Sequence, residues 1–333
     1  MLYFRKTLNL KTFPVCKTKI QNMIDGILIV DKPEGLTSHD VVARLRRILK
    51  TKRIGHTGTL DPFATGVLVM LVGKATRLAQ FLDKDKKEYE ATVRFGFETD
   101  TGDGTGELRI TNYGLRDFSY DELKNVLTSF LGEIEQTPPM YSAKKVAGKK
   151  LYELARKGIE IERQPVKVMI YEIKLIEDQK PKTENPQIND FGLRTLDFGL
   201  KVSCSAGTYI RTLAEDIGKQ LKTGAHLATL RRTRAGRFDL SEAVTLEELE
   251  KIVAEEKLGE VLISMNDAVA HLPKVVLNEA EIKNTQNGKK LKFEDAEIED
   301  NQPIKMIDDA KNLIAIGFYD EEQKFVQPRI VMI

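Results

Sequence analysis

The chain has 333 residues, with 52 Lys and Arg against 50 Asp and Glu, four His, two Cys and no Trp. This length suits one large domain with a smaller one, and 41% apolar residues indicate a globular protein rather than a disordered one. No apolar run reaches the roughly 18 residues of a membrane-spanning helix, and two Cys exclude a disulfide framework or a four-cysteine zinc site. We therefore expect a protein of the reducing cytoplasm, with no membrane span and no bound metal.

Charge is distributed unevenly along the chain. Residues 1–22 carry a net charge of +5, residues 23–271 of zero and residues 272–333 of −3. Two runs without acidic residues are strongly basic, 44–53 and 222–237, and a third cluster comprises Lys144, Lys145, Lys149 and Lys150. One such run alone is equally compatible with a solvated helix face. Three together favour a surface that binds a phosphate backbone.

The composition divides the chain into three parts. Residues 1–22 are a basic extension ahead of an internal start at Met23, or a targeting segment, although one Arg and no Ser are atypical of the latter. Residues 23–271 form the main domain, with a polar insertion at 177–195. Residues 272–333 are acidic with short strand-like pieces, which predicts a small β-rich domain.

Apolar patterning predicts the elements in chain order. Continuous or alternating apolar runs predict strands at 26–30, 67–72, 89–95, 166–175, 196–203, 313–319 and 328–333. Helical spacing predicts helices at 38–49, 120–131, 209–221 and 246–263. Thr37 or Ser38 can cap the first helix, with Asp40 in a capping box. Residues 31–35 are predicted as a turn and residues 54–66 as a loop. Strands separated unevenly by helices favour an α+β fold with a mixed sheet.

The loop at 54–66 is the most informative segment for chemistry. It places His56 and Asp61 on a backbone shaped by three Gly and one Pro, where catalytic groups are commonly held. An Asp before Pro is by itself more often a turn former, and a lone His is more often a packing residue. Arg211 is a candidate to hold Asp61 through a planar guanidinium, with an ordinary helix-surface Arg as the alternative. Tyr89 is equally compatible with a core aromatic.

Five co-linear segments resemble the TruB family of tRNA pseudouridine-55 synthases of the bacterial type. They are GILIVDKPEGLTSHDVV, GHTGTLDPFATGVLVMLVGKATRLAQFL, KEYEATVRFG with TDTGDG, QTPPMYSAKKVAGKKLYELARKG, and CSAGTYIRTLAEDIG with GAHLATLRRTRAG. The resemblance covers about residues 24–265, in order and at family spacing, and the tail resembles the small PUA-like domain more weakly. It implies an α+β pseudouridine synthase domain with a mixed, mostly antiparallel sheet, and a thumb-like insertion near 137–160.

The resemblance also implies residue roles. Asp61 would be the catalytic aspartate, paired with Arg211. Tyr89 would stack on the target base and handle its C5 proton, and His56 would displace and position the flipped nucleotide. The remaining implied binding residues, which support or line the pocket, are Lys32, Tyr209 and Leu230.

The implied reaction detaches uracil, rotates it and rejoins it to ribose through C5, so it needs no cofactor. The implied substrate is the T-arm of tRNA, bound by a monomer without an obligate protein partner, after the target base leaves its stack. Three routes stay open for Asp61: attack on the base, attack on the sugar, or removal of a ribose proton. Two other functions compete, a guide-dependent synthase resembling dyskerin and a non-catalytic RNA-binding protein or chaperone.

Overall fold

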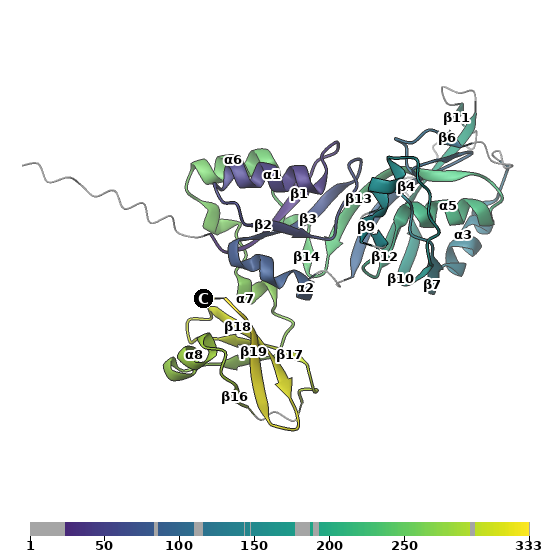
Figure 1. Ribbon diagram of the computed structural model, residues 1–333. Helices are drawn as coiled ribbons and strands as arrows, with labels where there is room; N and C mark the ends of the chain where they lie inside the picture. Colours follow the sequence, from purple (N-terminus) through teal and green to yellow (C-terminus); the bar gives the residue numbers. More distant parts are fainter. Residues whose placement is uncertain are drawn as a thin grey trace, which may run out of the picture.

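The computed structural model describes residues 24–82, 86–109, 116–142, 144–146, 148–176, 187–188, 193–293 and 297–332. The extension expected at 1–22 and most of the insertion expected at 177–195 lie outside these ranges. An elongated body is built on one large sheet, and a smaller β-rich body carries the C-terminus (Figure 1). No helix in the described ranges is long and apolar enough to cross a bilayer.

The large sheet is mixed and mostly antiparallel, as predicted. Its main strands, in spatial order, are β1 (Gly26–Lys32), β3 (Thr65–Val72), β13 (Ala225–Ala235), β4 (Lys87–Phe95), β12 (Arg194–Cys204), β10 (Val166–Leu175) and β7 (Gly132–Gln136). Shorter strands pair beside them: β2 (Ile54–Thr57) on β3, β14 (Phe238–Asp239) on β13 and β11 (Gln187–Ile188) on β12. Only the contact of β3 with β13 is parallel among these pairings.

Helices flank the two halves of this sheet (Figure 1). The longer ones are α1 (Ser38–Ile48), α3 (Tyr120–Ser129), α5 (Ile210–Gln220) and α6 (Leu246–Ala254). α1 packs against α6 beside β1 and β2, whereas α3 and α5 pack against β10 and β13. The short elements are α2 (Ala79–Leu82), α4 (Leu151–Ala155), α7 (Met265–Ala268), the 3₁₀ turns η1 (Gly73–Leu78), η3 (Leu240–Glu242) and η4 (Leu258–Glu260), and strands β5 (Glu98–Thr99), β6 (Leu108–Arg109), β8 (Lys145–Val146) and β9 (Lys149–Lys150).

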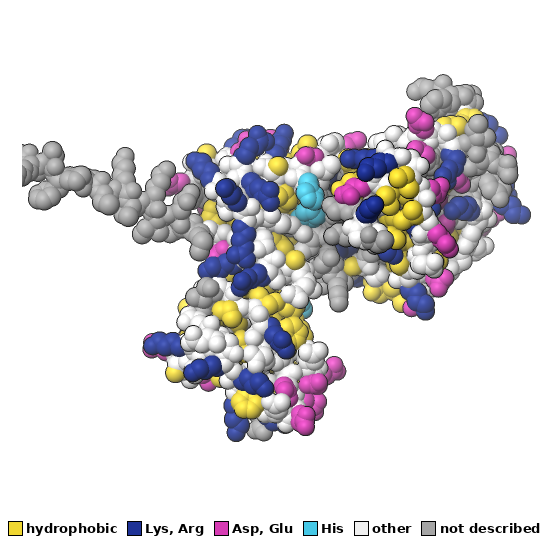
Figure 2. Space-filling model, in the orientation of Figure 1, with side chains coloured by type: hydrophobic (Ala, Val, Ile, Leu, Met, Phe, Trp, Pro, Cys, Tyr) yellow, Lys and Arg dark blue, Asp and Glu magenta, His cyan; other side chains and the backbone are white. Residues whose placement is uncertain are grey.

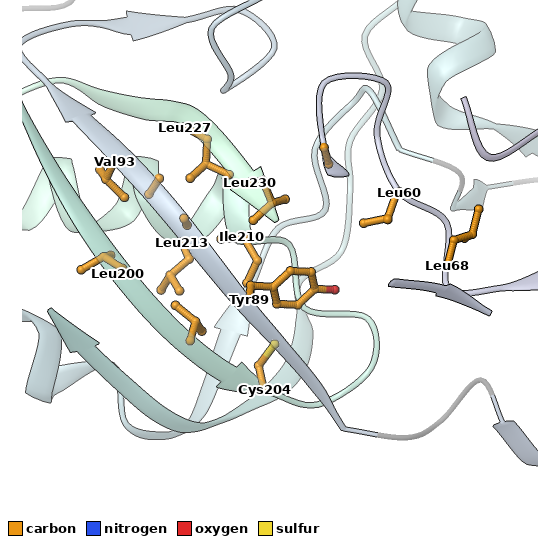
Figure 3. Close-up of a cluster of buried hydrophobic side chains, with 14 of the residues drawn as sticks. Leu60, Leu68, Tyr89, Val93, Leu200, Cys204, Ile210, Leu213, Leu227 and Leu230 are labelled. Carbon is orange, nitrogen blue, oxygen red and sulfur yellow. The ribbon is translucent and has the colours of Figure 1, made fainter. Parts of the chain in front are cut away.

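Local sequence accounts for the start and the faces of α1 and β4. Thr37 caps α1 and forms the predicted capping box with Asp40, and the apolar stripe that begins at Val41 is buried. In β4 the alternation from Tyr89 to Phe95 puts each apolar side chain in the core. Figure 3 shows this cluster under β4, β12 and α5.

Four predictions need correction. The strand at 26–30 continues through Lys32, so the turn is shorter than 31–35. The loop at 54–66 begins with a strand, because Ile54–Thr57 pairs with β3. The helix at 246–263 ends at Ala254, since Glu256 has a left-handed φ of +61°. The basic run 222–237 is not wholly a surface segment, because most of it forms the central strand β13, in which Arg232 is buried while Arg231 and Arg234 stay partly exposed.

The C-terminal body is a second sheet, in agreement with the predicted β-rich tail. Its strands, in spatial order, are β15 (Lys274–Val276), β17 (Pro303–Ile307), β18 (Leu313–Asp320), β19 (Phe325–Val331) and β16 (Leu291–Lys292), with α8 (Glu279–Gln286) packed beside them. Leu313 and Ile316 of this sheet share a hydrophobic cluster with Ile27 and Val67 of the large one. The two bodies are therefore joined through an apolar contact.

Gly66 allows β3 to approach β13, and its replacement is expected to be costly. Its φ is +98°, and a Cβ atom there would lie 2.2 Å from the carbonyl oxygen of Arg232. We expect Gly66→Ala to lower the free energy of unfolding by more than about 2 kcal/mol, measured by urea denaturation. Gly132→Ala is the matched control, because its φ of +94° is similar but nothing lies within 4 Å. If both variants lost the same free energy of unfolding, the close approach of β3 to β13 would not be the cause of the loss in Gly66→Ala.

Candidate active site

A cavity of about 270 Å³ opens where the segment Gly58–Asp61 faces β4, β13 and the start of α5. Its polar and aromatic lining includes Thr59, Asp61, Lys87, Ser142, Tyr89, Thr208, Tyr209, Arg211 and Arg232, with Leu230 on the apolar side. Asp61, Tyr89, Tyr209, Arg211 and Leu230, all singled out in the sequence, thus meet in one place. Lys32 and His56 are not in the lining.

Asp61 and Arg211 form a two-point ion pair at the cavity wall. The Arg211 Nε lies 2.9 Å from the Asp61 Oδ2, and its Nη2 donates to Oδ1 at 3.3 Å. The Arg211 side chain is 5% exposed and that of Asp61 35%. Arg211 is therefore not an ordinary helix-surface residue, and the carboxylate is fixed in orientation while still reachable from the cavity.

Arg211 is itself held by groups far away in the sequence. Its Nη1 donates to the Thr101 carbonyl at 2.7 Å and its Nη2 to the Tyr141 carbonyl at 2.6 Å. The buried Asp103 carboxylate lies 3.8 Å from Nη1. Asp103 in turn accepts hydrogen bonds from the hydroxyls of Thr101 and Thr105. The guanidinium is thus pre-oriented before any ligand arrives.

Opposing effects act on the Asp61 carboxyl. Burial raises its pKa above the ordinary value, and the Arg211 guanidinium opposes that rise. Asp103 adds a further negative charge that raises the pKa. Arg211 is therefore the main group that keeps Asp61 ionised.

Lys32 supports the Asp61 segment through hydrogen bonds to backbone carbonyls. Its fully buried ammonium group donates to the carbonyls of Pro62 at 3.1 Å, Ala64 at 2.6 Å and Pro33 at 2.9 Å. Burial lowers its pKa to about 8, against the opposing attraction of Asp61. Lys32 thus supports the pocket without lining it.

Tyr89 and Leu230 come from neighbouring strands. Leu230 is paired with Ala91, and Tyr89 with Arg232, in the register of β13 with β4. Tyr89 is 8% exposed, and in Figure 3 its ring projects from β4 toward the segment that carries Leu60. Tyr89 is thus both part of the core and part of the cavity wall. Burial raises the pKa of its phenol, which keeps the hydroxyl protonated at neutral pH.

Tyr209 is placed by the chain just before α5. Its backbone N–H donates to the Gln136 Oε1 at 2.9 Å, and its carbonyl accepts from the Gln136 Nε2 at 3.2 Å. Gln136 is 1% exposed, so this clamp is rigid. It holds the start of α5, and hence Arg211, against β7.

His56 stands apart from the cavity. It lies on β2, and its ring meets that of His39 edge to face at 5.7 Å between centroids. The structure therefore places His56 outside the cavity lining rather than against a base inside it.

Sequence reasoning missed two buried cations in the lining, Lys87 at 4% and Arg232 at 1% exposure. Both lie in segments that carry the family resemblance, and Arg232 also lies in the basic run 222–237, which was expected to be a surface. One signal was available. Arg232 follows Leu230 by two positions, so the two share one face of a strand.

Comparisons with known proteins identify the family of the chain. The family model described as TruB family pseudouridylate synthase (N terminal domain) matches residues 46–210. The model described as tRNA pseudouridylate synthase B C-terminal domain matches residues 211–270. The tRNA pseudouridine synthase B of Geobacillus thermodenitrificans is 44% identical, over 81% of this chain and 86% of its own length. That of Solibacter usitatus is 43% identical, over 80% of this chain and 85% of its own.

Chains from solved H/ACA RNP structures are also similar. A chain of an archaeal box H/ACA sRNP complex matches with a TM-score of 0.67 and 28% identity, covering 98% of this chain and 93% of its own length. A chain of an H/ACA RNP bound to a substrate RNA containing 2′-deoxyuridine matches with a TM-score of 0.66 and 26% identity. The match covers 92% of this chain and 85% of that one. With the two family models covering most of the main body and relatives above 40% identity, the chain belongs to the TruB family of pseudouridylate synthases.

Proposed function

We propose that this protein converts a uridine of tRNA, at position 55 in the T-arm, to pseudouridine without a guide RNA. The observation that carries the proposal is the Asp61 carboxylate, fixed by the Arg211 fork in a cavity also lined by Tyr89. Support for tRNA as the substrate comes from the relatives, which bear the name tRNA pseudouridine synthase B.

The reaction balances without an external reagent. The C1′–N1 bond breaks with its electron pair on uracil, and the C1′–C5 bond forms from an electron pair of the rotated base. The C5 proton then leaves to solvent, and N1 takes up a proton. Asp61 takes part in this exchange by attack on the sugar, by attack on the base or by removal of a ribose proton, and either attack would form a covalent intermediate that divides one hard step into two. Its fixed orientation removes the cost of ordering it in the transition state.

The cavity fits a single base that has left its stack. At about 270 Å³, it lies just below the roughly 300 Å³ of pockets for drug-sized ligands. Tyr89 and Leu230 supply the apolar contacts that offset the few kcal/mol of unstacking. We assign to His56, outside the lining and next to His39, the displacement and positioning of the flipped nucleotide. Lys32 and Tyr209 keep the two walls in place.

We place the RNA-binding surface over the end of α1 and over the segment 137–160. Arg46, Arg47 and Lys50 at the end of α1 are exposed, and Figure 2 shows Lys and Arg gathered over α1 and α6. The segment 137–160, with β8, β9 and α4, would grip the T-arm. We further propose that the chain consists of domains at 23–271 and 272–333. We also propose that it acts as a monomer, in the cytoplasm with its tRNA substrate.

Mapping the product on tRNA tests the proposal against its alternatives. The purified chain is incubated with an unmodified tRNA transcript, with the same transcript carrying cytidine at position 55, and with an isolated T-arm. Pseudouridine is located by carbodiimide modification and primer extension. We expect product at position 55 in the first and last RNAs. Product only after addition of guide RNA and partner proteins would support the H/ACA-type function, and tight binding without product would support an RNA-binding protein.

The pH dependence should report the charge on Asp61. Because activity requires the carboxylate, it should fall as pH drops through the pKa of Asp61, which burial places above the ordinary value. Arg211 opposes that rise, so Arg211→Gln should move the acid limb of the rate profile to higher pH. Single-turnover rates measured across pH in both proteins check this. An acid limb at the same pH in the variant would contradict the assigned role of Arg211.

A further inference from the structure

Arg232 differs from its neighbours on β13. Arg231 pairs with Asp31 and Arg234 pairs with Asp239, and their side chains are 39% and 42% exposed. The Arg232 side chain is 1% exposed, and no carboxylate among the described residues forms an ion pair with it. A buried cation without a counter-ion is expensive. An apolar residue would have a lower desolvation free energy at this position. We therefore look for interactions of the guanidinium that an apolar side chain could not make.

Three acceptors from different parts of the site surround this guanidinium. Its Nε donates to the Val67 carbonyl at 2.7 Å, and its Nη2 to the Gly58 carbonyl at 2.8 Å. Tyr89, the cross-strand partner of Arg232, lies beside it in the lining of the same cavity and presents the phenolic oxygen as a third acceptor. Gly58 and Val67 lie on either side of Asp61 in the chain, so one side chain ties both flanks of the Asp61 segment to Tyr89.

The direction of a hydrogen bond between Arg232 and the Tyr89 hydroxyl follows from chemistry. A guanidinium has only donors, so the Tyr89 oxygen accepts, and the phenolic hydrogen is left for a different acceptor. Tyr89 lines the cavity, so that acceptor can be an oxygen of a bound nucleotide. Gly58 allows the arrangement, because its φ is +63° and a Cβ there would lie 3.2 Å from the Arg232 Nη1.

We propose that Arg232 is a positioning residue of the pseudouridine-forming site: it sets the distance between Tyr89 and the Asp61 segment and directs the Tyr89 hydroxyl hydrogen toward the substrate. This inference rests on the proposed function. It assigns Tyr89 a hydrogen-bond donor role in the reacting complex. Arg232 itself acts only through Tyr89 and the Gly58–Val67 backbone.

The test compares charge-conserving variants on one strand. Arg232→Lys keeps the charge but not the planar fork, and Arg234→Lys is the matched control at an exposed ion pair. C5-tritium release from T-arm RNA is measured in a single turnover at saturating enzyme, with the RNA dissociation constant and the melting temperature measured alongside. We expect Arg232→Lys to be slower by about 10-fold or more, with RNA affinity within about threefold of wild type. The control should stay within about threefold of wild type in both quantities. If Arg232→Lys does not fold, Arg232→Gln, which keeps amide donors, should show the same loss of rate.

A double variant separates positioning from general structural support. Tyr89→Phe removes the acceptor, so adding Arg232→Lys to it should cost at least about threefold less than adding it to wild type. Independent, multiplicative effects would overturn the proposal, as would a near-normal rate in Arg232→Lys. Absence of release from the wild-type protein would instead overturn the proposed function itself.

Discussion

Asp61→Asn should abolish turnover and leave RNA binding within a few-fold of wild type. The amide is nearly the same size, but it carries no charge and cannot serve as nucleophile or base, so we expect a rate at least about 10³-fold lower. The cavity wall should keep its shape, because Arg211 is also held by the carbonyls of Thr101 and Tyr141. Tritium release and filter binding on the same T-arm RNA measure the two quantities.

A second Arg–Asp pair provides the control for that experiment. Asp197 accepts from the Nε and Nη2 of Arg94 at 2.8 and 2.7 Å, on the half-exposed side of β4 and β12. Asp197→Asn breaks a fork of the same type away from the cavity, at a cost of about 1 kcal/mol or less, and should turn over normally. Loss of RNA binding together with activity in Asp61→Asn would show that Asp61 is structural.

Arg211→Lys should lower the rate by about 100-fold, since an ammonium group cannot reproduce the planar fork. The lysine keeps the positive charge but cannot bind both Asp61 oxygens and also reach the carbonyls of Thr101 and Tyr141. The defect should therefore appear in the single-turnover rate more than in RNA affinity. Arg94→Lys is the matched control at the pair outside the cavity. Near-normal turnover in Arg211→Lys would refute the two-point geometry as a requirement for catalysis.

Local patterns in the sequence predicted those parts of the fold that local forces decide. The capping box of α1 needs only Thr37 and Asp40, three positions apart. The faces of β4 follow from alternation, and β10 spans the predicted residues 166–175. The predicted end of the helix at 246–263 was wrong for a local reason too, because the left-handed backbone of Glu256 prevents the helix from continuing.

Long-range pairing decided what the sequence could not. Asp61 and Arg211 are 150 positions apart, and their meeting depends on how α5 is seated against β7 through Gln136. The resemblance of the motifs to the TruB family suggested this pair. The positions of the two residues in the sequence alone could not predict that they would meet. Likewise, the inward face of Arg232 follows from the pairing of β13 with both β3 and β4. A basic run in isolation carries no sign of that burial.

The central claim, that the cavity isomerises a T-arm uridine by means of Asp61, is tested most directly with T-arm RNA tritiated at C5 of its uridines. Wild-type protein and Asp61→Asn are each incubated with this RNA, without cofactor, guide RNA or partner protein. The account predicts release of about one equivalent of tritium per T-arm by the wild type and none by the variant. Tight binding with no release by the wild type, or equal release by both proteins, would contradict it.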